Sequence, residues 1–95
     1  MKLMYFEIVE NCLEGLNVYD GYLDENINED FVEKISRMGK FIFMKDIPKP
    51  YFRVIVRGKY TIKGSIGNDT IRIILPDGAS PDILNEIKNY INNEN

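Results

Sequence analysis

The stretch YFRVIVRGKYTIKGSIGNDTIRIIL, residues 51–75, decides the fold class because its apolar residues recur at every second position. Alternation of this kind places one set of side chains on each face of a β-strand. The apolar set keeps a single parity on both sides of Gly58, and its members are Phe52, Val54, Val56, Tyr60, Ile62 and Ile66. We therefore expect strands with one face in a core and the other face open.

A hairpin with the three-residue loop 57–59 preserves this parity, because it places Val56 opposite Tyr60. A two-residue loop would mix the two faces. One long strand bent at Gly58 is the alternative. We prefer the hairpin.

A second turn at GNDT, residues 67–70, is predicted to bring Ile66 opposite Ile71 and Ile62 opposite Leu75. The side chains at the alternate positions then lie together on the face that points away from the core. Its members in this stretch include Arg53, Ile55, Thr61, Lys63, Arg72 and Ile74.

Two strands are predicted before this stretch. Residues 3–9 alternate between two faces. Met4, Phe6 and Ile8 are expected to face the core, with Tyr5 and Glu7 on the other side. Residues 40–46, KFIFMKD, are apolar on both faces, which is typical of a central or doubly covered strand.

Residues 10–28 leave alternatives open. ENCLEG allows a short helical turn, whereas LNVYDGYL allows a short extended piece with a turn near Asp20 and Gly21.

Two helices are predicted. The first, residues 29–38, follows Asn28 as its N-cap and ends at Gly39, which can adopt the left-handed conformation that ends many helices. Its apolar stripe is Phe31, Ile35 and Met38. The second begins at Ser80-Pro81-Asp82, a cap followed by proline and an acid in the first turn. Its stripe is Ile83, Leu84, Ile87 and Ile91.

The element order is therefore β-α-β-β-β-β-α in a single domain, residues 1–95. Each helix has one apolar stripe and the strands of residues 51–75 have one apolar face. We predict an α+β two-layer sandwich, with a roughly five-stranded, mostly antiparallel sheet and both helices on one face.

Composition excludes several kinds of chemistry. The 95 residues include no histidine and a single cysteine, Cys12, so histidine-based nucleophile pairs, cysteine zinc sites and disulfides are not expected. The opening MKLMYFEIVENC is too short and too charged for a signal peptide or membrane span. We expect a cytoplasmic protein that is not an enzyme, uses no cofactor and has no membrane partner.

The acidic stretch 20–30 places Asp24, Asn26, Asn28 and Asp30 at alternate positions, as at the start of a calcium loop. Glu29 and Ile35 then occupy the positions that require glycine and glutamate. The sequence favours a solvated acidic loop, and no metal site is predicted.

Charge divides along the chain. Residues 1–39 carry three basic and nine acidic residues, residues 40–75 eight basic and two acidic, and residues 76–95 one basic and four acidic. The basic segment can form a binding surface, or it can lie against the acidic segments in the fold. We favour the second interpretation.

The outer sheet face is nevertheless the best candidate for function. Exposed isoleucines there favour contact with another protein or with a second copy of the chain. The alternative is a weak nucleic-acid-binding module on the basic face of residues 51–75, although this face is expected to lack aromatic residues for base stacking. The candidate partner-binding residues are Arg53, Ile55, Arg57, Lys63, Arg72 and Ile74.

Overall fold

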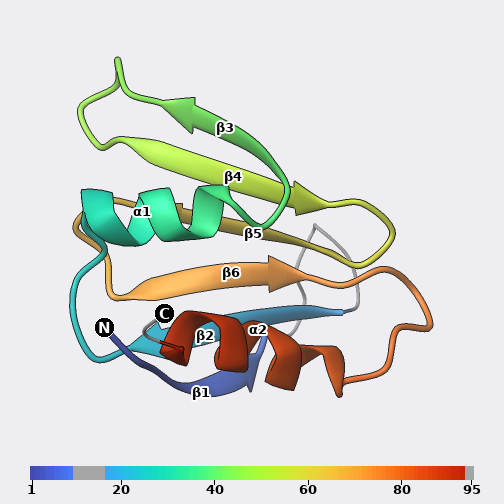
Figure 1. The fold of residues 1–95 in the computed structure, drawn as a ribbon. Coiled ribbons are helices and arrows are strands. Elements are labelled where there is room, and N and C mark those ends of the chain that lie inside the picture. Colours follow the sequence, from blue (N-terminus) through green and yellow to red (C-terminus); the bar gives the residue numbers. More distant parts are fainter. Residues whose placement is uncertain (10–16, 94–95) are drawn as a thin grey trace.

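The computed structural model describes residues 1–9 and 17–93, which form one antiparallel sheet of six strands and two helices (Figure 1). The strand order across the sheet is β1-β2-β6-β5-β4-β3. Both helices lie on one face of the sheet (Figure 1). The elements are β1 Leu3–Ile8, β2 Val18–Leu23, α1 Glu29–Ser36, β3 Lys40–Met44, β4 Tyr51–Val56, β5 Tyr60–Ser65, β6 Thr70–Ile74 and α2 Ile83–Asn92. The predicted α+β class is confirmed, with six strands rather than about five.

The additional strand is β2, which runs straight through the position where a turn at Asp20 and Gly21 was considered. The prediction of a turn there is wrong, because Gly21 is a strand residue against which side chains of the neighbouring strands pack closely. A Cβ atom at Gly21 would lie 2.9 Å from the Leu3 side chain and 3.2 Å from Ile71. The helical turn considered for ENCLEG lies outside the described residues.

The hairpin between β4 and β5 has the predicted three-residue loop. Val56 is opposite Tyr60 and Val54 is opposite Ile62. Gly58 at the loop centre has a φ of 75°, a backbone conformation that glycine adopts without strain. The alternative of one bent strand is wrong.

The register after the second turn differs from the prediction by two residues. Ile71 is opposite Gly64 rather than Ile66. Strand β5 ends earlier because its loop is bonded to Ile27, whose carbonyl accepts from Gly67 N at 3.0 Å. A shift of two residues leaves every side chain on its predicted face.

Strand β1 contains a bulge between Leu3 and Tyr5, which changes the predicted parity at Leu3 and Met4 only. Leu3 is buried, whereas the side chains of Met4 and Ile8 are 48% and 56% exposed. The prediction that Met4 faces the core is therefore wrong, whereas Ile8 is on the same side as Phe6, opposite Tyr19, but lies outside the core. Phe6 is half-buried and packs against the core, and Tyr5 and Glu7 lie on the opposite side as expected.

Strand β3 is an edge strand, so the prediction of a central or doubly covered position is wrong. Its only strand neighbour is β4, among the residues that the structure describes. Ile42 and Met44 are 40% and 51% exposed on the face away from the helices. An apolar edge strand is an exposed surface that proteins normally cover or protect with charge.

The other edge, β1, is bonded to helix α2. Asn92 Oδ1 accepts from Leu3 N at 2.7 Å, and Asn92 Nδ2 donates to Leu3 O at 3.2 Å. Lys88 Nζ donates to Met4 O at 3.2 Å. Together with the bulge, these bonds make β1 a poor template for further strand pairing.

Helix α1 begins as predicted, because Asn28 Oδ1 accepts from Phe31 N at 2.9 Å. It ends at Ser36, two residues early, and Gly39 does not take the expected left-handed conformation. Gly39 is instead needed for a close approach: a Cβ atom there would lie 2.4 Å from the Ile55 carbonyl oxygen.

Helix α2 begins at Ile83, later than expected, and Asp82 makes no side-chain capping bond. The expected cap, Ser80, instead accepts a bond at Oγ from Asp82 N at 3.3 Å.

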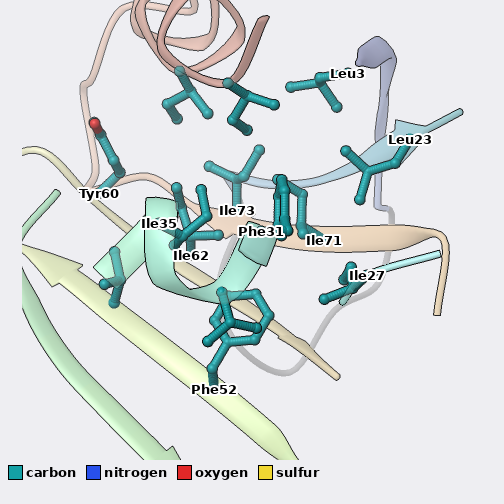
Figure 2. Close-up of a cluster of buried hydrophobic side chains, with 14 of the residues drawn as sticks. Leu3, Leu23, Ile27, Phe31, Ile35, Phe52, Tyr60, Ile62, Ile71 and Ile73 are labelled. Carbon is teal, nitrogen blue, oxygen red and sulfur yellow. The ribbon is translucent and has the colours of Figure 1, made fainter. Parts of the chain in front are cut away.

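The core lies between the helices and the sheet (Figure 2). Phe52 is fully buried, and its ring meets Phe31 edge-on at a centroid distance of 6.5 Å. Burial, then Glu86 and Tyr90, raises the pKa of Tyr60 to about 12, so its hydroxyl stays neutral at ordinary pH. The two helices cover one face of the sheet, and no helix of the described residues covers the other.

Candidate functional site

The face of the sheet opposite the two helices, called the open face below, is the candidate site. Directly opposed residues in an antiparallel pair project from the same face, so the strand register shows which side chains lie together there. They form three rows that run across the strands.

The middle row, called the charged row, crosses all six strands in register. From β1 to β3 its members are Glu7, Asp20, Arg72, Lys63, Arg53 and Ile42. The two acids lie at one end and the three basic residues follow. The row therefore changes sign across the sheet.

Two contacts fix the geometry of the charged row. Arg72 Nε donates to Asp20 Oδ1 at 3.1 Å, where the acidic part meets the basic part. Arg53 Nη2 donates to the Tyr51 hydroxyl at 3.3 Å. The buried Nε of Arg53 has no hydrogen-bond partner within the described residues.

A second row is rich in tyrosine. Tyr5 and Tyr22 stack with ring centroids 4.7 Å apart and an interplanar angle of 17°. Further along, Tyr51 is opposite Met44. The carboxylate of Glu7, followed by burial and by Asp20, raises the pKa of Tyr22. The β1–β2 part of the open face is therefore electrostatically negative.

The third row is mostly aliphatic. Ile74 is opposite Thr61, Thr61 is opposite Ile55, and both isoleucines are half-buried. Val18 continues the row on β2 but is fully buried, so it adds nothing to the accessible surface of the open face. The open face therefore has apolar side chains on both sides of its charged row.

The structure brings five of the six predicted binding residues together on the open face. Arg57 is the exception, because it lies exposed in the β4–β5 loop. The other five are Arg53, Ile55, Lys63, Arg72 and Ile74.

Sequence reasoning missed the acidic end of the charged row, because the extended piece considered for LNVYDGYL was broken by a turn at Asp20 and Gly21 and was not placed in the sheet. It also expected no aromatic residues on this face, which is wrong. The parity of Tyr51 with Arg53 was a usable signal, and so was the predicted outward position of Tyr5. The side chains that sequence reasoning missed on this face are Tyr5, Glu7, Asp20, Tyr22, Ile42, Met44 and Tyr51.

The favoured interpretation of the divided charge has support in two ion pairs. Asp20 pairs with Arg72, and Lys59 Nζ lies 3.2 Å from Glu86 Oε1. Each joins an acidic segment to the basic segment 40–75. The pairing is partial, because Arg53 forms no ion pair with any described carboxylate.

Side chains of the acidic stretch 20–30 make hydrogen bonds that stabilise the fold. Asp24 Oδ1 accepts from Lys2 N at 2.7 Å, and Asn28 caps α1. Within residues 1–9 and 17–93, no three Asp, Glu, Cys or His residues lie close enough together to hold a metal ion. None of the described helices is long and apolar enough to cross a membrane.

A groove lies on the helix side of the sheet, between α1 and β3. Its apolar lining includes Val32, Phe41, Phe43 and Ile66, and its rim includes Glu29 and Lys45. This groove exists because α1 packs over β4 and leaves the helix-side residues of β3 half-buried.

Comparison of the chain with models of protein families, with curated proteins and with solved structures found no match.

Proposed function

We propose that this chain is a small, non-catalytic cytoplasmic protein that acts by binding another protein through its open sheet face. The observation that carries the proposal is the combination of exposed Ile42, Met44 and Tyr5 on that face with a row of charges between apolar rows. Protein interfaces combine aromatic, methionine and arginine side chains in this way.

Burial of these side chains by a partner is energetically favourable. Apolar surface removed from water contributes about 25 cal/mol per Å². Arg53 adds specificity, because it is opposite the exposed Ile42 in the strand register, and its guanidinium donates to the Tyr51 hydroxyl and pairs with no described carboxylate. A carboxylate on a protein partner can form a charge-assisted bond with such a group.

Nucleic acid is the second candidate, and one observation favours it. Tyr51 lies beside Arg53 and Lys63, so a stacking ring and cations share the face. Glu7 and Asp20 weigh against it, because they occupy the same charged row and repel phosphates. We therefore prefer a protein partner.

Site-specific photo-crosslinking in cells tests this proposal with a matched pair of positions. Ile42 and Ile47 are 40% and 41% exposed, but only Ile42 lies on the open face. A benzophenone amino acid is placed at each position in turn. We expect a discrete protein adduct from position 42. The adduct yield from position 47 should be at least about tenfold lower, because that position lies outside the proposed contact surface.

Three results would contradict the proposal. They are equal adducts from both positions, adducts from position 47 alone, or no adduct from either. An adduct from position 42 that nuclease removes would instead establish the nucleic-acid candidate. Anisotropy titration with mixed-sequence oligomers at about 50 and 200 mM salt checks that outcome, because phosphate binding weakens steeply over this range.

A further inference from the structure

The charged row is complementary to itself. Its acids are on β1 and β2, and its basic residues are on β6, β5 and β4. Neighbouring strands lie about 4.8 Å apart, so the row extends roughly 20 Å from Glu7 to Arg53. A partner that matches it must present the same charges in the reverse order.

A second copy of the chain presents that reverse order if it is turned about the correct axis. Sheets that pack face to face keep their strands within about 30° of each other, so two-fold axes in the interface run along or across the strands. An axis across the strands keeps the strand order, and acids then face acids. An axis along the strands reverses it, and acids face basic residues.

We infer that the partner of the open face is a second copy of this chain, related by a two-fold axis that runs along the strands near β6. This inference rests on the proposed function, because it identifies the protein that the open face binds. It places β1 of one copy over β4 of the other, with Glu7 facing the partner's Arg53. Strand β3, which carries Ile42 and Met44, then lies at the rim of the interface beside β1 of the second copy.

The same axis pairs the remaining groups. Asp20 faces the partner's Lys63, and in the neighbouring row Tyr5 faces the partner's Tyr51. The two Arg72 side chains meet near the axis, where each is held by its own Asp20 at 3.1 Å. The Arg53 guanidinium, which has no described carboxylate partner, gains one from the second copy.

The size of the face sets the expected affinity. Five overlapping strands of about five residues cover roughly 20 × 17 Å in projection, from the strand spacing and the rise per residue. This is small beside the roughly 800 Å² per partner of a standard interface. We expect a weak dimer with a dissociation constant on the order of 10–100 μM.

Charge exchange between two variants tests the inference by sedimentation equilibrium. In a Glu7→Arg dimer, the introduced arginine faces Arg53 at both symmetric contacts. In an Arg53→Glu dimer, the introduced glutamate faces Glu7 at both contacts. Each variant alone should associate at least about tenfold more weakly than the wild type, because close like charges are unfavourable. In their 1:1 mixture both contacts are complementary, so association should return to within about threefold of the wild type.

The variants must fold for this test to decide. Glu7 is exposed, but Arg53 is half-buried, so circular dichroism is recorded for each. If Arg53→Glu does not fold, Arg53→Gln replaces it. Glu7→Arg mixed with Arg53→Gln should still associate more tightly than Glu7→Arg alone, because both like-charge contacts are removed, one becoming neutral and the other attractive.

The outcomes separate this inference from the proposed function. A wild-type dimer whose variants are not rescued by mixing would overturn the two-fold arrangement. A wild type that stays monomeric at about 1 mM, well above the expected constant, overturns the second copy as partner. If position 42 still crosslinks to a protein of another mass, the proposed function survives and only this inference fails.

Discussion

Replacing Phe52 with alanine should destabilise the protein by about 3–5 kcal/mol, the usual cost of removing a buried phenylalanine. Phe52 is fully buried on β4, and its ring contacts Phe31 of α1. Gly64 on β5 lies against the same ring, since a Cβ atom there would be 2.8 Å from it. The truncated side chain would leave a cavity between the sheet and α1 that neither backbone can fill.

Urea unfolding followed by circular dichroism measures this effect. Phe43→Ala is the matched control, because Phe43 is on the same side of the neighbouring strand but only half-buried. We expect its loss to be about half as large or smaller, in proportion to its burial. Equal losses for the two variants would show that Phe52 is not the central contact between α1 and the sheet.

Gly39→Ala should cost about 3 kcal/mol, at the upper end for steric overpacking. The added methyl group would lie 2.4 Å from the Ile55 carbonyl oxygen and 3.2 Å from the Val56 Cα. These are backbone atoms of β4, so no side-chain rotation relieves the contact. The connection between α1 and β3 must move, and β3 with it.

Gly58→Ala is the control for Gly39→Ala. Nothing lies within 4 Å of a Cβ atom at Gly58, whose φ of 75° is the only obstacle. That conformation costs a non-glycine residue about 1–2 kcal/mol. Thermal unfolding of both variants should rank Gly39→Ala as clearly less stable. The reverse order would contradict the close approach of Gly39 to β4.

The alternating pattern of residues 51–75 was sufficient to predict the class of fold. It placed Phe52 and Ile62 in the core and Arg53 and Lys63 together outside, because two strands linked by a loop of known length have only one register that keeps the faces separate. The predicted register after Gly67 was wrong by two residues. A shift of two leaves each side chain on the same face of the sheet, so the assignment of residues to faces was unaffected.

The errors occurred where tertiary contacts override local pattern. Gly21 resembled a turn residue, and Gly39 resembled a helix stop, but each is present because another segment packs too closely for a side chain. A single sequence does not reveal such long-range approaches. The bulge at Met4 similarly changed the parity at the start of β1 without any local signal.

The candidate site was predictable only in its basic part. Arg53, Lys63 and Arg72 follow from the alternation, whereas Asp20 required β2 to be recognised and placed beside β6. The position of β3 was misjudged because an apolar edge strand has the same composition as a central one. The exposed Ile42 and Met44 that result are part of the case for a partner.

The most direct test of a working open face is the concentration dependence of isoleucine methyl NMR signals. The chain places isoleucines on both sides of one sheet: Ile42, Ile55 and Ile74 on the open face, and Ile62, Ile71 and Ile73 in the core. Ile66 reports on the groove between α1 and β3, and Ile47 reports on the exposed loop.

Spectra recorded from about 20 μM to 1 mM span the expected dissociation constant. We predict that the methyl signals of Ile55 and Ile74 shift along one binding curve, with a smaller shift for Ile42 at the rim, while those of the core, the groove and the loop remain nearly constant. Constant open-face signals over this range, or shifts confined to Ile66, would contradict self-association through the open sheet face.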